Sequence, residues 1–261
     1  MRYLVFLLLI LVPILGVWTF VAADDWGVWF PENVSTFGGH IDWLFYVIMV
    51  PIAITFVGTE VVLAWAALKF SSKNLPGKSM FTHGSHKLEM IWTAVPAVLL
   101  LAIAIIQMGA WTEIKFEEGF RDGEGRFTIE NPIAEVWASQ FDWRAIYPDE
   151  SGNLDGVDAF ESSWEFVVPV DEKIVFHLRS RDVLHSFFVP AFRLKQDAVP
   201  GMTIPVWFQA EKVGEYDLIC AELCGWGHYK MSGRVTVLSQ EDYDAWVAEQ
   251  RARLYSGGID E

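Results

Sequence analysis

The chain has only two cysteines among its 261 residues and no Cys-x-x-Cys-His segment. Without that segment it lacks the usual attachment site for a c-type haem. Two cysteines allow a single disulfide, which an exported compartment would permit. Positive charge is also scarce: from Thr112 onward there are 28 acidic and 14 basic residues, which accounts for −14 of the total charge of −15. This balance argues against nucleic acid as a partner and favours either a basic protein partner or simple solubility.

Both cysteines lie in one short segment, from Cys220 to Met231, with the spacing Cys-x3-Cys-x3-His-x2-Met. Thiolates and thioethers are soft ligands that suit copper, and imidazole also binds it. Zinc is the alternative metal, but methionine is not among its usual ligands. A disulfide between Cys220 and Cys224 would leave His228 and Met231 unexplained. Because a single-copper site needs only one cysteine, the spacing predicts two copper ions bridged by two thiolates.

A second imidazole must come from elsewhere in the chain. His185, 35 residues before Cys220, is the candidate, in a loop after an expected strand. His177 competes for the role, but it alternates with apolar residues on that strand and should face solvent. The other histidines lie at the membrane end of the chain, too far away to bind the same ion: His40, His83 and His86.

Apolar segments dominate the first half of the chain. Residues 1–23 are either a signal peptide or a first membrane helix. Segments 41–70 and 88–111 are each long enough to cross a bilayer, so residues 24–111 are expected to form a transmembrane hairpin. The loop between the two helices carries lysines and no acidic residue, which places it in the cytoplasm and both flanks outside. Glu60, within the first helix, favours a partner subunit over lipid.

The second half is expected to be a polar linker, an all-β domain and a C-terminal helix. The linker is 112–125, the domain 126–238, and the helix with its tail 239–261, where Ser239 and Asp242 resemble a capping box. Short strands without helical stretches between them indicate a β-sandwich or a small Greek-key barrel. The expected strands are 133–137, 143–147, 164–168, 173–178, 206–210, 215–219 and 233–238.

Three blocks resemble subunit II of the haem-copper cytochrome c oxidases: residues 86–93 with Pro96, residues 182–201, and residues 220–231. Their order along the chain agrees with that family. The resemblance implies a cupredoxin domain with a dinuclear, mixed-valence copper centre of the CuA type. It assigns bridging thiolates to Cys220 and Cys224, one imidazole per copper to His185 and His228, and weak axial donors to Met231 and the backbone carbonyl of Glu222.

The resemblance also implies roles outside the copper ligands. The Glu222 carboxylate would reach a Mg or Mn ion at the boundary with subunit I, because hard cations prefer oxygen ligands. Glu89 would lie at the mouth of a proton channel. Many members have Gln-Trp-x-Trp where this chain has Gln140-Phe141-Asp142-Trp143. Phe141 and Trp143 thus occupy the region where electrons enter, with phenylalanine in place of the first tryptophan.

The function implied by the resemblance is electron transfer in a membrane oxidase. Electrons would pass from a c-type cytochrome, or another basic donor, through the copper centre to haem in subunit I, for oxygen reduction to water with proton pumping. Subunit III is a further expected partner. The complex would lie in a bacterial-type inner membrane, with the copper domain on the periplasmic side. The alternatives are a CuA-containing nitric-oxide reductase and a membrane-tethered copper chaperone or storage protein.

Overall fold

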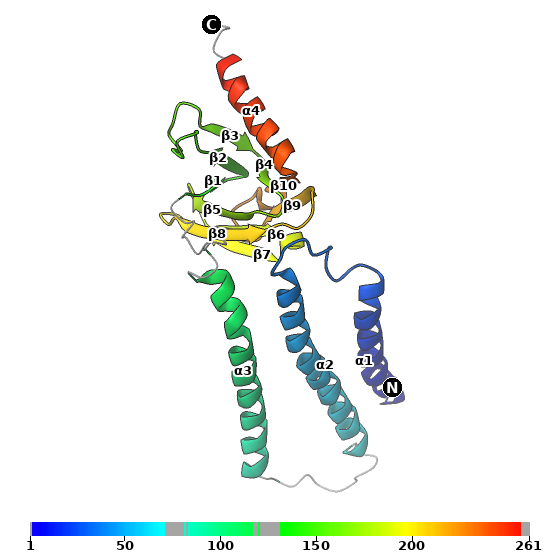
Figure 1. Ribbon diagram of the computed structural model, residues 1–261. Coiled ribbons are helices and arrows are strands. Elements are labelled where there is room, and N and C mark those ends of the chain that lie inside the picture. Colours follow the sequence, from blue (N-terminus) through cyan, green and yellow to red (C-terminus); the bar gives the residue numbers. More distant parts are fainter. Residues whose placement is uncertain (1, 71–80, 82, 117–119, 121–130, 257–261) are drawn as a thin grey trace. The chain divides into compact units, whose positions relative to one another are not determined.

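A computed structural model describes residues 2–70, 81, 83–116, 120 and 131–256 of the chain (Figure 1). The described chain divides into two compact units. One consists of residues 1–29 and 42–109, and the other of residues 30–41 and 110–261. Most of the expected linker, the lysines at 73 and 78, and residues 257–261 of the expected C-terminal tail lie outside the described residues.

The first unit is helical. It contains α1 (Arg2–Asp25), α2 (Gly38–Lys69) and α3 (His86–Lys115), the last two of which extend beyond its bounds. Both α2 and α3 are long and apolar enough to cross a membrane, with a mean hydropathy of 2.2 each. They begin slightly earlier than the sequence predicts, and α3 ends four residues later. Nearly all side chains of α3 are exposed in the isolated chain, so lipid or a partner must cover this apolar surface.

The second unit contains a sandwich of two five-stranded sheets. The order in one sheet is β3-β2-β1-β5-β8, and in the other β4-β10-β9-β6-β7. Most neighbouring strands are antiparallel, but β1 pairs with β5 and β4 with β10 in parallel, so the chain crosses between the sheets. The strands are β1 (Ala134–Ser139), β2 (Asp142–Tyr147), β3 (Phe160–Ser163), β4 (Glu165–Pro169), β5 (Lys173–Ser180), β6 (His185–Val189), β7 (Leu194–Ala198), β8 (Ile204–Gln209), β9 (Gly214–Cys220) and β10 (Ser232–Leu238). This architecture confirms the predicted fold class.

The core of the sandwich is rich in aromatic side chains. Phe176 of β5 is fully buried and lies 5.1 Å from Phe166 and 5.0 Å from Phe187, between ring centroids. These side chains come from both sheets, so their contact joins the two layers. Each buried phenylalanine contributes about 1.5–3 kcal/mol through removal of apolar surface from water. The aromatic core continues through Trp143, whose ring centroid is 5.6 Å from that of Phe187, to the strand ends that carry the metal-binding residues.

The sequence predicts seven strands, and the structure has ten in its described part. The three that it misses are β3, β6 and β7. β7 contains Lys195, Gln196 and Asp197, which mask an alternating apolar pattern, and β3 has only four residues. The sequence predicts a loop at His185, and this prediction is wrong: His185 is the first residue of β6.

Helix α4 (Gln240–Ser256) closes one side of the sandwich (Figure 1). Its N-terminus is capped as predicted, because the Asp242 N–H donates a hydrogen bond to Ser239 Oγ over 3.1 Å. Trp246 packs against Tyr147, with 5.1 Å between ring centroids. Leu254, an apolar residue near the end of the helix, is exposed. The second half of the helix also contacts the domain, because the Arg251 guanidinium donates a hydrogen bond to the Pro148 carbonyl over 3.2 Å and the Tyr255 hydroxyl donates one to the Asp158 carboxylate.

Tyr147 provides a test of how the two sheets are held together. Its buried hydroxyl donates to the Val167 carbonyl over 2.8 Å and accepts from the Val167 N–H over 2.7 Å. The Tyr147→Phe change leaves both backbone groups buried without a partner, so we expect the free energy of unfolding to fall by about 1–3 kcal/mol. Chemical denaturation of the purified chain in detergent measures this loss. Tyr216→Phe, which removes a solvent-accessible hydroxyl bonded to the Lys212 carbonyl, is the control and should have a clearly smaller effect.

Candidate metal centre

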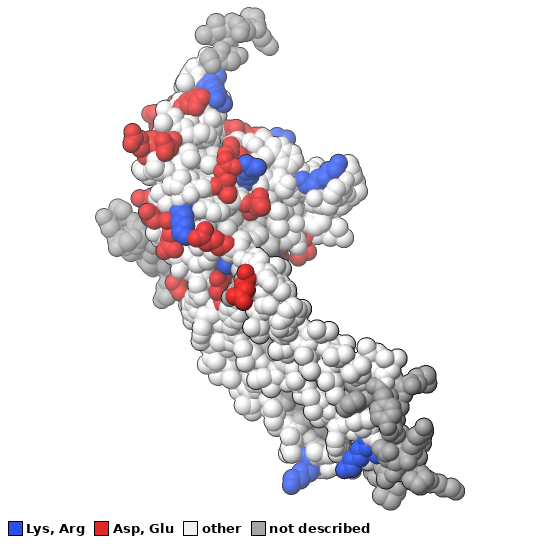
Figure 2. Space-filling view, turned by 90° about the vertical axis from the view of Figure 1, so that its right-hand side faces the viewer, with Lys and Arg blue, Asp and Glu red and all other residues white. Residues whose placement is uncertain are grey.

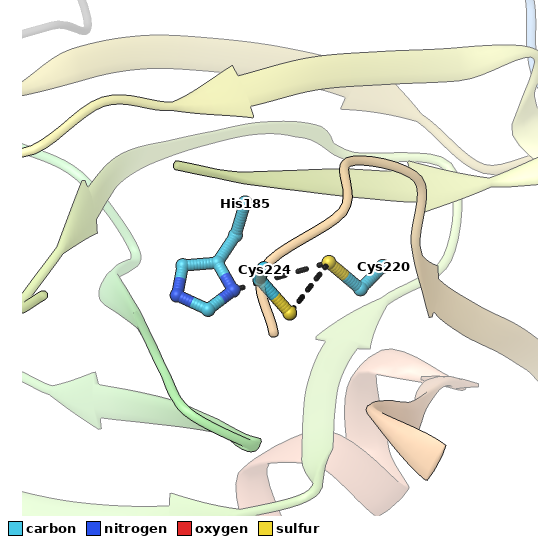
Figure 3. A group of neighbouring side chains, drawn as sticks. All are labelled: His185, Cys220 and Cys224. Atoms are coloured by element: carbon cyan, nitrogen blue, oxygen red, sulfur yellow. Dashed lines mark hydrogen bonds between the residues drawn. The ribbon is translucent and has the colours of Figure 1, made fainter. Parts of the chain in front are cut away.

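Donor atoms from β6, from the end of β9 and from the loop between β9 and β10 converge on one place. Cys220 Sγ lies 3.8 Å from Cys224 Sγ and 3.9 Å from His185 Nδ1 (Figure 3). Cys224 Sγ lies 3.7 Å from His228 Nδ1 and 3.7 Å from Met231 Sδ. Figure 3 shows the two sulfur atoms and the imidazole nitrogen directed toward one another. All five side chains that the sequence predicts as copper ligands are thus brought together.

A sixth donor is a backbone oxygen. The carbonyl of Glu222 is 3.2 Å from Cys220 Sγ, on the side of the cluster formed by the first turn of the loop. Met231 Sδ is 3.2 Å from His185 Nδ1. These six atoms are the donors that the resemblance assigns to two copper ions.

Backbone hydrogen bonds hold these donors in position. The Cys220 N–H donates to the Met231 carbonyl over 3.1 Å, so the first and last ligands of the loop are neighbours across β9 and β10. The Ala221 N–H donates to the Ser186 carbonyl over 3.0 Å, which joins the same loop to β6 beside His185. A short 3-10 helix, His228–Lys230, turns the His228 side chain back toward Cys224. The site is therefore built on paired strand ends rather than on a free loop.

The distances separate the possible chemistries of the two cysteines. A disulfide requires an S–S bond of about 2.05 Å, and the observed separation is 3.8 Å. Two sulfurs at this separation can both bind one first-row metal ion at about 2.3 Å. The thioether and the two imidazoles complete a set of soft and borderline donors, which fits copper better than zinc. The donor set fits the predicted dinuclear copper centre.

The candidate site is closed to solvent. His185 is 0% exposed, and Cys220, Cys224 and Met231 are all buried, whereas His228 is half-buried. Burial of so many polar and ionisable groups is unfavourable unless they are paired or bind a metal. The cluster therefore has the character of a permanent metal site.

Two further residues support the ligands, and the sequence predicts no role for either. Asp182 Oδ1 is 2.8 Å from His185 Nε2, which leaves Nδ1 directed at the sulfurs. Such carboxylate partners fix the ring orientation of metal-binding histidines. The side-chain amide of Gln140 donates a hydrogen bond to the Cys224 carbonyl. Asp182 is the first residue of the 182–201 block, and Gln140 is the first residue of the segment that corresponds to Gln-Trp-x-Trp, but neither position indicates a contact with the ligands.

The two aromatic residues expected near the point of electron transfer lie in different places. Trp143 is buried behind the site, with its ring centroid 6.3 Å from that of His185. Phe141 is half-buried and lies over the loop itself: a Cβ added to Gly227 would be 2.5 Å from its ring. Its outer edge contacts the exposed Trp226, with 5.1 Å between ring centroids. Phe141 is therefore not the outermost aromatic residue at the metal loop.

The remaining candidates lie away from this cluster. His177 is a half-buried residue within β5, and the predicted solvent-facing position is thus only partly correct. Glu89 belongs to α3 in the helical unit, where its Oε2 atom is 3.1 Å from His86 Nδ1. Neither residue contributes to the metal site.

Comparison with known proteins identifies the family. Residues 137–238 match the family described as "Cytochrome C oxidase subunit II, periplasmic domain", and residues 23–109 match its transmembrane domain. Cytochrome c oxidase subunit 2 of Cereibacter sphaeroides is 32% identical, over 88% of this chain and 82% of that protein. The chain belongs to the cytochrome c oxidase subunit II family. The alternative cytochrome c oxidase subunit 2 of Bradyrhizobium diazoefficiens is 30% identical, over 85% of this chain and 84% of that protein.

Solved structures include the periplasmic domain of subunit II of the cytochrome oxidase of Bradyrhizobium japonicum. It is 29% identical, covers 46% of this chain and 94% of its own, and has a TM-score of 0.42. Membership of the subunit II family makes the chain a membrane-bound subunit of a haem-copper oxidase with a cupredoxin-like domain. It also supports an electron-entry role for the cluster of cysteines and histidine.

The two thiols of this subunit II chain differ in acidity. Burial raises the pKa of Cys220, but hydrogen bonds with His185 and with the backbone of Ser186 outweigh burial and lower this pKa to about 6. At Cys224, burial and the adjacent Cys220 sulfur raise the pKa to about 11. At neutral pH the two sulfurs therefore share one proton. Because metals bind thiolates, that proton must leave when a metal binds.

This proton sets the pH dependence that we expect for copper binding. Between the Cys220 pKa of about 6 and the Cys224 pKa of about 11 the two thiols release one proton. Burial lowers the pKa of His185, but its hydrogen bonds with Cys220 and Asp182 raise it above the usual value, so a second proton must leave wherever this imidazole is protonated. Affinity should therefore rise by at least about tenfold per pH unit. Below pH about 6 at least two protons must leave, and the slope should steepen. Competition with a chelator of known affinity measures the slope on the reduced, metal-free chain. Affinity independent of pH above neutrality would contradict the assignment, and His177→Gln, outside the cluster, should leave the slope unchanged.

Proposed function

We propose that this chain accepts single electrons from a c-type cytochrome, or another basic carrier, through a CuA centre. The electrons then pass to haem in subunit I, where oxygen is reduced to water with proton pumping. The observation that carries the proposal is the convergence of two thiols, two imidazoles, a thioether and a carbonyl in a closed site of a subunit II family member. A mononuclear electron-transfer copper site uses one thiolate, whereas this site holds two.

The contacts among the donor atoms support the proposed ligand roles. Cys220 and Cys224 are proposed as the bridging thiolates, because each lies near a different imidazole. Met231 and the Glu222 carbonyl lie next to the sulfurs as weak donors. When bound, a copper pair sharing one electron supplies electron transfer with little change of geometry. The protein supplies rigidity: paired strands fix the cysteines and Met231, and Asp182 fixes the ring of His185.

The charge of the domain supports a basic donor. Acidic side chains are spread over the face of the domain drawn in Figure 2, with some lysine and arginine side chains among them. Opposite charges steer a donor toward the domain and speed its association. Added salt should weaken this steering, because exposed charges are screened beyond about 10 Å at 0.1 M salt.

Partner subunits and orientation are part of the same proposal. The apolar, exposed surfaces of α2 and α3 are proposed to face lipid and subunit I, with subunit III as a further partner. The lysine-rich end of the hairpin would lie in the cytoplasm of a bacterial-type cell, and the domain in the periplasm. Glu89 is proposed at a proton-channel mouth. The Glu222 carboxylate is proposed as an oxygen ligand of Mg or Mn shared with subunit I.

Two other functions fit parts of the site. A copper chaperone or storage protein would need ligands that exchange metal readily, whereas His185 is fully buried and Met231 is 2% exposed. Burial therefore disfavours exchange. A nitric-oxide reductase could use the same electron-accepting centre, and the family relation favours oxygen as the acceptor.

Turnover of the purified complex tests the function. With a reduced, lysine-rich c-type cytochrome as donor, the complex should consume oxygen rather than nitric oxide. Cys224→Ser removes one sulfur and should lower this rate by more than about 100-fold, since even outer partners of metal sites matter 10- to 100-fold. Haem content should stay unchanged, and His177→Gln should keep the wild-type rate. Consumption of nitric oxide without oxygen, or full oxygen turnover by Cys224→Ser, would refute the proposal.

A further inference from the structure

The metal loop displays one large aromatic side chain in an unusual position. Trp226 lies two residues after Cys224 and two before His228, and its side chain is 82% exposed. Tryptophan rarely remains so exposed without a partner, since burying its ring removes a large apolar area from water. Trp226 is not alone, because Leu223 and Tyr229 of the same loop are 81% and 76% exposed. Together these three side chains form an apolar patch on the loop that holds the metal ligands.

The loop is shaped so that Trp226 meets Phe141. The two rings are arranged edge to face, with 5.1 Å between their centroids and 68° between their planes. Phe141 in turn lies directly on the two glycines that flank Trp226. A Cβ at Gly225 would lie 3.2 Å from the Phe141 ring, and one at Gly227 would lie 2.5 Å from it. A side chain at Gly227 would displace the ring, and one at Gly225 would crowd it, so the Gly-Trp-Gly sequence seats Phe141 beneath Trp226.

We propose that Trp226 is the residue at which electrons enter this chain, and that Phe141 positions it. The inference rests on the proposed function. Phenylalanine is harder to oxidise than tryptophan and is half-buried here, whereas Trp226 offers an indole ring at the surface within the ligand loop itself. The occupant of the patch is a basic single-electron carrier protein, because the domain is strongly acidic. Tryptophan is also enriched among the residues that contribute most to binding at the centres of protein–protein contacts.

The test uses the assembled, copper-loaded complex and stopped-flow mixing with a reduced, lysine-rich c-type cytochrome. Trp226→Ala should lower the second-order rate constant for reduction of the copper centre by about 30-fold, the scale of a central contact residue. Hexaammineruthenium(II) is a small reductant that does not dock on the patch. Its rate of reduction of the copper centre should therefore stay within about twofold of the wild-type rate in Trp226→Ala. Copper content and the copper spectrum should not change, because the side chain is exposed and binds no metal.

Matched variants distinguish entry at Trp226 from a general effect of the patch. Leu223→Ala and Tyr229→Ala shorten side chains of similar exposure in the same loop and should each slow reduction by less than about threefold. Trp226→Phe should retain more activity than Trp226→Ala. Phe141→Leu should slow the reaction less than Trp226→Ala, since it only loosens the support.

Each outcome decides the inference. Wild-type reduction of Trp226→Ala by the cytochrome, an equal loss in Tyr229→Ala, or a greater loss in Phe141→Leu overturns it. Loss of copper from both Trp226→Ala and Trp226→Phe also overturns it, because the tryptophan would then be part of the metal site's framework. If the cytochrome fails to reduce the wild-type copper centre at all, the proposed function itself fails.

Discussion

The hydrogen bond from the Cys220 N–H to the Met231 carbonyl closes the loop on which the function of this chain depends. It makes the first and last predicted ligands neighbours, and the ladder between β9 and β10 continues directly from it. The intervening residues must then fold back over a short span, which brings Cys224 and His228 against Cys220 and Met231. The second bond, from Ala221 to Ser186, adds β6 and with it His185. Two sheets of buried aromatic side chains provide the rigid support for this loop.

Fixing these donors in a buried site lowers the stability of the metal-free protein. A thiolate, a thiol and an imidazole are buried together, and burial of such groups is unfavourable unless they are paired. Asp182 compensates in part by pairing with His185, and its position at the surface keeps the carboxylate partly solvated. Metal binding would satisfy the remaining donors and couple loading to stability. A small geometric change between oxidation states is the expected benefit of such a fixed site.

The ligand set could be predicted from the sequence because two thiols, an imidazole and a thioether at such short spacing are typical of a metal site. The strands with clear apolar patterns can be predicted as well, whereas β6 and β7 cannot, because polar residues occupy their pattern. His185 and Ser186 begin β6, and Gln196 lies in the middle of β7. Two of the contacts at the site join residues far apart in the sequence: Gln140 with Cys224, and Phe141 with Trp226. The third, between Asp182 and His185, depends on the start of β6, which the sequence does not predict. No local pattern carries that information, whereas the paired strands make it evident.

The central claim is that two sulfurs bridge two copper ions in one closed site. Electron paramagnetic resonance of the fully copper-loaded, oxidised chain tests it most directly, combined with copper analysis of the same sample. The account predicts two copper ions per chain and hyperfine splitting from one electron shared equally over two copper nuclei. Splitting from a single copper nucleus in the fully loaded wild-type chain would contradict it.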